Sequence, residues 1–289
     1  MKLSRLAWTL WALVPVGLLA FHFGPGQAAF REDRAAKLVA TADGFQQEAL
    51  ALQSAAYEKH LAAINARIAA FGKDDESLRN AAQQATAAEE AAYALASAAW
   101  RKAADALSEA QSFVDELGGP VREEIRLAKA RALVRTGDVA AGANELEDLL
   151  YDAGEREELD TPLALEAREE LATAYYYGAR LMRLAGKPAE EWREVAGRAR
   201  QNFRYLAEGA KARGAGSDEV ANHEKNGELV LNLEQSSLDE LYAKPRPKDS
   251  PTGKCNGLGN QPRPGRKGRS QGDKPAKGAG MNGEIGNGW

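Results

Sequence analysis

A long apolar run near the N-terminus is the strongest pattern in the chain. Residues 6–23 contain no Asp, Glu, Lys or Arg, and as a helix they would extend about 27 Å, close to the thickness of a bilayer core. Lys2 and Arg5 precede the run, and aromatic residues lie near both of its ends. This arrangement is typical of a membrane helix whose N-terminus is inside. We therefore predict a membrane anchor over Leu6 to Phe23 and a body outside the cytoplasm.

A cleaved signal peptide is the alternative interpretation of residues 1–29. Gly26-Gln27-Ala28 places small residues at the usual −3 and −1 positions before a cleavage site. Cleavage there would release a secreted body. We prefer the retained anchor because the apolar run is long for a signal peptide, and because Gly24-Pro25-Gly26 would end a membrane-spanning helix.

Residues 30–118 are predicted to form long helices, because they contain no proline and are dominated by alanine and other strong helix formers. Asp74 and Asp75, just after Gly72, supply a helix start. The region is expected to form two long helices in an antiparallel hairpin, shorter helices broken at Gly44, or degenerate repeats. Apolar residues recur at helical spacing in two groups: Leu50, Tyr57, Leu61, Ile64, Ile68 and Phe71, then Leu95, Ala99, Ala103, Leu107, Ala110 and Val114.

The region 119–243 carries a more specific helix-pair pattern. Pro120 starts a helix, Thr136-Gly137-Asp138 ends it, and a second helix follows. Small residues at Ala130 and Gly142 precede large apolar residues at Leu146 and Leu149. This spacing, over about Glu123 to Ala153, resembles a tetratricopeptide repeat (TPR), in which two antiparallel helices pack through small residues. The sequence departs from the TPR pattern where Arg126 replaces a bulky aromatic residue and Gly142 replaces alanine.

A second helix pair follows at a longer spacing. Asp160-Thr161-Pro162 starts one helix, and Gly186-Lys187-Pro188 turns the chain into the next. A last helix, at about residues 218–233, could cap the stack. Because isolated helix pairs cannot bury their apolar faces, neighbouring pairs must stack. The predicted fold class is therefore all-α: a TPR-like antiparallel helical stack (α-solenoid) after an N-terminal transmembrane helix, with a disordered C-terminal tail.

The tail, residues 244–289, differs in composition from the rest. It contains eleven glycines and six prolines, and its ten Lys and Arg against three acids give +7. Because the chain carries −4 in total, residues 1–243 carry −11. Such a tail is predicted to be disordered, and an acidic body argues against nucleic-acid binding. The only cysteine, Cys255, excludes an intrachain disulfide and a Cys-based zinc site.

Candidate chemistry is sparse. The three histidines, His22, His60 and His223, are far apart in sequence, and no His, Cys and carboxylate cluster has metal-ligand spacing. No Gly-rich loop precedes a helix with phosphate-binding spacing. The Glu89-Glu90 pair is interpreted as solvated helix surface. The sequence therefore predicts no catalytic, cofactor-binding or metal-binding residues, no cofactor, and a protein that is not an enzyme.

The candidate partner-binding residues lie in the second helix pair. On a helix, Tyr175, Tyr176 and Tyr177 point about 100° apart, so at most two can face the core. Aromatic and arginine side chains are common binding anchors, which makes one exposed tyrosine a candidate site together with Arg180, Arg183 and Trp192. The alternative is that these aromatic residues only pack between helices.

The pieces together resemble a bacterial group of membrane-anchored proteins with TPR-like helices. Members of this group accompany von Willebrand factor A domain proteins of the Bat (aerotolerance) type and a MoxR-type ATPase. The resemblance is carried by the short basic start, the anchor ending in residues 20–27, the TPR-like units and the basic tail. It implies a single-pass inner-membrane protein with a periplasmic body. The implied function is a scaffold for protein partners, von Willebrand factor A domain proteins among them.

Two other functional classes stay open. One is a coiled-coil-like structural spacer of the envelope, which residues 30–118 would favour if they form one extended hairpin. The other is an enzyme with an unrecognised site, which would need a buried carboxylate or histidine cluster in a cleft.

Overall fold

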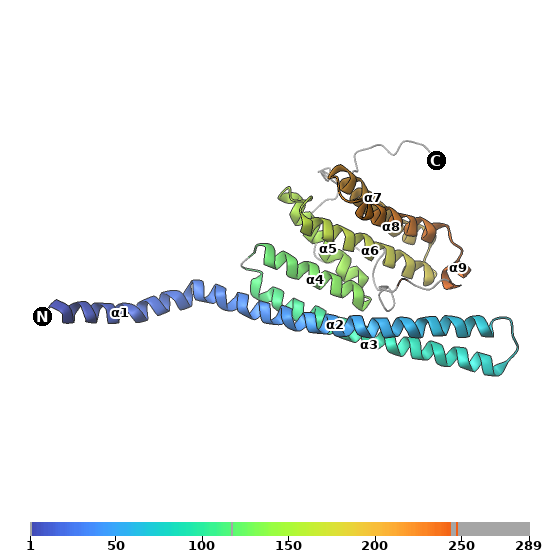
Figure 1. The fold of residues 1–289 in the computed structure, drawn as a ribbon, viewed down its shortest axis with the longest axis horizontal. Helices are drawn as coiled ribbons and strands as arrows, with labels where there is room; N and C mark the ends of the chain where they lie inside the picture. Colours follow the sequence, from blue (N-terminus) through green and yellow to red (C-terminus); the bar gives the residue numbers. More distant parts are fainter. Residues whose placement is uncertain (1, 117, 244–246, 248–289) are drawn as a thin grey trace.

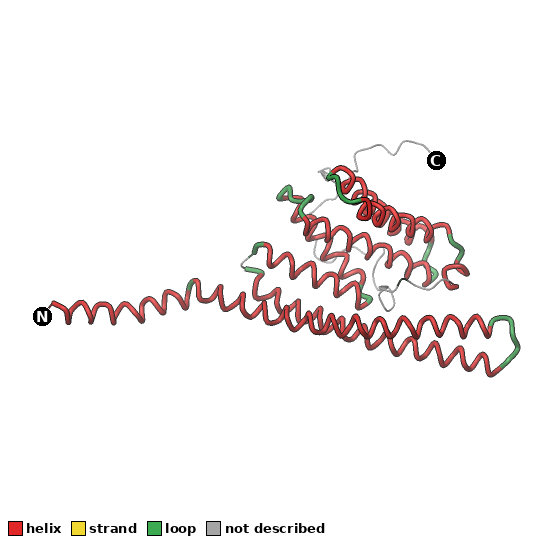
Figure 2. The backbone as a smooth tube through the Cα atoms, in the orientation of Figure 1, coloured by secondary structure: helices red, strands yellow, loops and turns green. Residues whose placement is uncertain are grey.

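The computed structural model describes residues 2–116, 118–243 and 247, and these residues contain helices and no strand (Figures 1 and 2). The predicted all-α class is therefore confirmed for this part of the chain, whereas the predicted disordered tail lies almost entirely outside the described residues. The helices, in order, are α1 Lys2–Phe23, α2 Pro25–Ala70, α3 Glu76–Val114, α4 Pro120–Thr136, α5 Val139–Glu155, α6 Pro162–Leu184, α7 Ala189–Ala212, α8 Ser217–Gln235 and α9 Leu238–Ala243.

Helices α2 and α3 form one extended antiparallel hairpin (Figure 1). Helix α2 begins at Pro25, five residues before the predicted start, and runs through Gly44 without a break. The alternative of shorter helices broken at Gly44 is therefore wrong. The predicted start of the second helix is confirmed, because the Asp75 side chain accepts hydrogen bonds from the backbone N–H groups of Ser77 and Leu78. Those donors would otherwise lack a partner in the first turn.

Alanine at every seventh position forms the seam of this hairpin. On α2 the series is Ala35, Ala42, Ala49, Ala56 and Ala63, each at most 1% exposed. On α3 the matching positions are Ala82, Glu89, Ala96, Ala103 and Ala110. A seven-residue repeat keeps one face of each helix against its partner. Small side chains at the seam allow the two backbones to approach closely.

Large and small residues alternate across the seam. The His60–Glu89 contact fixes the register. Four residues from it on each helix, Ala56 lies opposite Tyr93, and steps of seven from there put Ala49 opposite Trp100 and Ala42 opposite Leu107. Those three α3 residues are 5%, 3% and 0% exposed. Each alanine therefore makes room for a large side chain on the other helix, as close packing requires.

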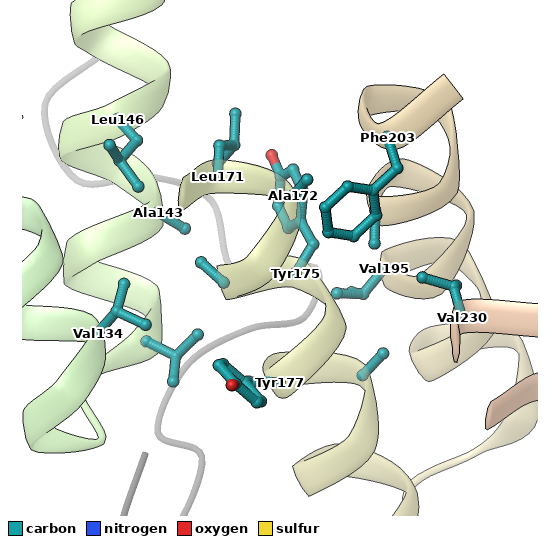
Figure 3. Packing of buried hydrophobic residues seen from close by; sticks show 14 of the residues in the cluster. Val134, Ala143, Leu146, Leu171, Ala172, Tyr175, Tyr177, Val195, Phe203 and Val230 are labelled. Atoms are coloured by element: carbon teal, nitrogen blue, oxygen red, sulfur yellow. The ribbon is translucent and has the colours of Figure 1, made fainter. Parts of the chain in front are cut away.

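Helices α4 to α8 continue from the hairpin as an antiparallel stack, in which each helix packs on its neighbours in sequence (Figure 1). Helix α4 lies on α3, and α6 also contacts α4 and α9. Most of the core lies between α4 and α8, as the close-up of its buried side chains shows (Figure 3). Helices therefore occupy the ranges in which the sequence predicted helix pairs, whereas the TPR-like class and the domain boundaries stay predictions.

Helices α4 and α5 come closest at Ala130 and Gly142. A Cβ atom added to Gly142 would lie 2.8 Å from the Ala130 carbonyl oxygen and 2.5 Å from Val134 Cγ2. Both distances are shorter than real Cβ contacts. The glycine that departs from the TPR pattern therefore has a physical reason, because alanine does not fit between these helices.

We expect Gly142→Ala to lower the free energy of unfolding by about 1–2 kcal/mol, because overpacking outweighs the better helix propensity of alanine. The matched control is Gly197→Ala in α7, where an added Cβ meets nothing within 4 Å. The control should raise stability by about 0.5–1 kcal/mol. Urea denaturation followed by circular dichroism measures both changes. Equal stabilisation by the two substitutions would contradict the close approach.

Candidate partner-binding surface and membrane anchor

Helices α4, α6 and α8 contribute to one face of the stack, and one of the predicted binding residues of α6, Tyr176, lies on it. Ion pairs join these three helices: Arg131 of α4 contacts Glu170 and Glu166 of α6 at 2.6 and 2.7 Å. His223 of α8 lies 3.9 Å from Glu169 of α6. We call this surface the even-helix face.

The tyrosine triplet divides between the core and the even-helix face. Tyr175 and Tyr177 are each 5% exposed, whereas Tyr176 is only partly buried. Figure 3 shows Tyr175 near Phe203 of α7 and Tyr177 on the side of α6 nearer α4 and α5. The packing alternative therefore applies to Tyr175 and Tyr177. Tyr176 follows Glu169 by two helical turns, so it shares the even-helix face.

Burial and hydrogen bonding give two of these tyrosines distinct environments. The Tyr175 hydroxyl donates a hydrogen bond to Glu147 Oε1 of α5. Burial, followed by the negative charge of Glu147, raises the pKa of Tyr175 far above its ordinary value. Burial also raises the pKa of Tyr176, although Arg180 acts in the opposite direction. Both phenols therefore stay neutral at physiological pH.

Trp192 is a packing residue rather than an exposed anchor. Its side chain is 5% exposed, and the guanidinium groups of Arg183 and Arg193 lie 4.7 and 5.2 Å from its ring centroid. Cation–π contacts of this kind stabilise a buried aromatic ring whose surroundings are charged. The prediction that Trp192 is available to a partner is therefore wrong.

Arg183 and Arg180 also have structural surroundings. Arg183 donates hydrogen bonds to the backbone carbonyls of Leu233 and Ser236, so it satisfies acceptors at the C-terminus of α8. Burial, with a smaller effect of Arg193, lowers the pKa of Arg183. Arg180 is 8% exposed. Of the six predicted contact residues, Tyr176 is therefore the one best placed to touch a partner.

A buried acid–base pair that the sequence interpretation missed lies in the hairpin. His60 Nδ1 is 2.7 Å from Glu89 Oε1, and the two residues are 5% and 4% exposed. The interpretation of Glu89 as solvated surface is therefore wrong, although it holds for Glu90. The signal that could have revealed the pair is the alanine series of α3, in which Glu89 is the one exception. The pair lies in the helix seam, and among the described residues no group of three or more His, Cys, Asp or Glu is arranged to hold a metal ion.

Helix α1 exposes most of the apolar side chains that the structure describes along it. Trp8 and Trp11 are 72% and 73% exposed. The others are 56% to 62% exposed: Leu13, Val14, Val16, Leu18, Leu19 and Phe21. In Figure 1, α1 points away from the rest of the protein. Exposed apolar surface of this extent is common at sites that contact a membrane or another protein.

By length and hydropathy, no single helix among the described residues qualifies as a membrane span. One bent pair, Leu13–His22 with Gly26–Ala70, qualifies when its two helices are taken together, and their axes differ by 45°. The predicted single span over Leu6 to Phe23 is therefore not confirmed and stays a prediction.

The comparisons with known proteins identify no relative. No protein-family model matches the chain. No curated protein and no solved structure matches it either.

Proposed function

We propose that the protein is a non-enzymatic scaffold that is held at a membrane by α1 and binds protein partners through its helical stack. The observation that carries this proposal is the exposure of apolar side chains along α1, from Trp8 to Phe21. Leaving such side chains in water is unfavourable by about 25 cal/mol for each Å² of apolar surface. A bilayer would remove this cost, and the basic residues before the run favour an N-terminus inside.

The geometry of α2 would then place the stack close to the membrane. The C-terminal end of α3 contacts the start of α2, because Arg31 pairs with Glu116 and Arg34 lies over the Phe113 ring. These residues follow the end of α1 by about ten positions, or roughly 15 Å of helix. The stack therefore begins near the anchor, whereas the hairpin tip lies about 70 Å along α2 from it.

The proposed binding surface is the even-helix face. It presents Glu166 and Glu169, whose side chains are 54% and 47% exposed, and two helical turns after Glu169 the partly buried Tyr176. An aromatic ring among charged groups is a common arrangement at protein interfaces. The resemblance to the Bat-associated group supports von Willebrand factor A domain membrane proteins as partners and the periplasmic side of a bacterial inner membrane as the location.

A structural spacer is the second candidate function. The observation that favours it is the unbroken hairpin of α2 and α3, which reaches far beyond α4 (Figure 2). In this role the length of the hairpin sets the distance between two components of the envelope, and the stack supports the end of the hairpin nearest α1.

A pull-down from detergent-solubilised membranes tests the scaffold proposal. We expect the double variant Glu166→Lys, Glu169→Lys to lose most of the partner recovery while keeping its helical circular dichroism spectrum. The matched control is Glu194→Lys, Glu208→Lys on α7, where the side chains are 51% and 63% exposed and pair with Arg198 and Arg204. The control should recover the partner like the native protein. Equal recovery with both variants would refute the even-helix face as the binding surface.

Shortening the hairpin separates the two candidates. Removing residues 50–63 and 86–99 deletes two matching heptads from each helix and keeps the seam register. The hairpin becomes shorter by about 21 Å. The scaffold proposal expects partner recovery to persist, because the even-helix face is untouched. Loss of recovery with the shortened hairpin, and not with the charge reversals, would favour the spacer.

A further inference from the structure

The outer half of the hairpin, residues 49–100, has an unusual surface. Ser97 of α3 contacts the end of α4, because its hydroxyl donates a hydrogen bond to the Thr136 carbonyl at 2.8 Å. Beyond this point α2 and α3 extend past the end of α4 (Figures 1 and 2). The seam there consists of alanines, the polar residues Gln53, His60 and Glu89, and the large buried residues Ile64, Tyr93 and Trp100. Two helices that pack only on each other leave much of their surface in water, so this part of the hairpin gains less from burial than the part that α4 covers.

An apolar stripe lies on α2 next to this seam. Leu50, Tyr57, Ile64 and Phe71 each follow a seam position by one residue, with the same seven-residue spacing, and Leu61 and Ile68 fill the gaps. Leu50, Ile68 and Phe71 are 51%, 62% and 87% exposed, Tyr57 and Leu61 are half-buried, and Ile64 is 7% exposed and packs into the seam. We call these six residues the α2 stripe. A heptad spacing is the pattern by which one helix packs along another.

The α2 stripe continues a side of the hairpin that already carries a helix. On α3, Ser97 and Gln111 follow seam residues by one position, and both contact α4: Ser97 through Thr136, and Gln111 through a 2.6 Å hydrogen bond from Lys129. In an antiparallel pair, positions that follow the seam on either helix lie on the same side. The α2 stripe therefore extends the side that α4 covers, into the part of the hairpin where α4 has ended.

The distribution of charge favours a second copy of the chain over a membrane as the surface that covers the α2 stripe. Residues 49–72 contain three charged side chains, Glu58, Lys59 and Arg67, and residues 80–100 contain only Glu89 and Glu90. This part of the hairpin is thus nearly neutral, whereas residues 1–243 together carry −11. A nearly neutral surface can meet an identical surface without the like-charge repulsion that the acidic body would otherwise impose. Tip-first insertion into a membrane is disfavoured, because Lys73, Asp74, Asp75 and Glu76 would have to enter the hydrocarbon region.

We propose that the α2 stripe is a self-association surface, on which α2 of a second copy packs in parallel to form a two-fold symmetric dimer. A closed two-fold interface uses the same patch on both copies, so each residue of the stripe lies near its own equivalent. The membrane anchor of the proposed function would align two copies in the same direction and raise their effective concentration. The interface itself depends only on the hairpin and is independent of partner binding by the even-helix face.

Site-specific crosslinking of the full chain tests this proposal. In a Cys255→Ser background, Ile68→Cys should form a disulfide-linked dimer on mild oxidation, because equivalent residues of the stripe face each other across the two-fold axis. The matched control is Leu95→Cys, which is 60% exposed and lies on the opposite side of the hairpin, one position before the seam. The control should remain uncrosslinked. Crosslinking at both positions to the same extent would overturn the proposal.

A charged substitution in the stripe tests dimerisation independently of crosslinking, with the full-length protein in detergent. Ile68→Glu should weaken dimerisation by about tenfold or more, since it places a charge in an apolar interface, while Leu95→Glu leaves the mass measured by light scattering unchanged. Circular dichroism should show intact helices in both variants. A native chain that is monomeric at all concentrations, or an Ile68→Glu variant that remains dimeric, would refute the self-association surface. Partner recovery by a monomeric Ile68→Glu variant would leave the proposed scaffold function intact.

Discussion

Trp192→Ala is expected to lower the free energy of unfolding by about 3–5 kcal/mol, the range for removing a buried aromatic side chain from a core. The ring is 5% exposed and packs between the guanidinium groups of Arg183 and Arg193. Arg183 in turn holds the carbonyl groups at the end of α8. Loss of the ring therefore leaves a cavity and also removes the surface against which this arginine is positioned.

Urea denaturation of the native protein and of two variants measures this effect. Tyr151→Ala is the matched control, because Tyr151 is an aromatic residue of the stack that is 36% exposed. The control should cost less than about 1 kcal/mol. If Trp192→Ala lowered the free energy of unfolding by no more than the control does, Trp192 would not be a core residue. The sequence-based prediction that it contacts a partner would then be supported.

Arg126→Ala is expected to cost about 2–3 kcal/mol, because it leaves the acids around a buried arginine without their partner. Arg126 donates hydrogen bonds of 2.8 Å to both Glu145 and Asp152 of α5, and its side chain is 8% exposed. The cost falls below that of a fully buried pair because the Asp152 side chain is 40% exposed and water can replace part of the interaction. The control is Arg204→Ala, whose pair with Glu208 is exposed on both sides, so its loss should leave the free energy of unfolding nearly unchanged.

The same ion pair predicts a direction of pH dependence. Burial alone would raise the pKa of Glu145, but hydrogen bonds from Arg126 and Lys129 outweigh it and hold the pKa below its ordinary value. A carboxyl whose pKa is depressed in the folded state stabilises the protein above its unfolded pKa, and this contribution is lost as the pH falls. The native protein should therefore lose more stability on acidification than Arg126→Ala does. An equal loss in both proteins would contradict the pairing.

Local patterns in the sequence were sufficient to predict most of the helices. Alanine-rich composition, Asp75 as a cap and Pro120 and Pro162 as helix starts lie within a few residues of the ends they determine. Their effects are local, so they can be recognised without knowledge of the fold. Gly142 was recognised as a departure from the TPR pattern. Its cause, the carbonyl of Ala130 at the closest point of α4 and α5, appears only once the two helices are placed together.

The binding residues were harder to predict because exposure depends on what surrounds a helix. The side chains of three consecutive tyrosines on a helix point in different directions. Which of these directions faces the core depends on the helices packed around α6, and the sequence of α6 alone does not contain this information. The structure places α5 and α7 against Tyr175 and leaves Tyr176 partly exposed. Trp192 and Arg183 were both among the predicted partner contacts, whereas the structure places the Arg183 guanidinium over the Trp192 ring and against carbonyl groups at the end of α8.

Glu89 shows how a regular pattern can contain a functional or structural exception. A helical face rich in glutamate is usually solvated, but the seven-residue alanine series places position 89 in the seam, opposite His60. A buried polar pair at one seam position is a known means of fixing the register of a helix pair. Here it fixes the register in which three alanines of α2 lie opposite Tyr93, Trp100 and Leu107 of α3.

Attachment to the membrane is the central claim of this account, and an alkaline carbonate wash of isolated membranes tests it most directly. The account predicts that the full-length protein stays in the membrane pellet with its N-terminal segment intact, and that a variant lacking residues 2–23 is recovered in the soluble fraction with its helices folded. Release of the whole full-length population by carbonate, with a mature N-terminus near Ala29, would contradict the account and support a cleaved signal peptide.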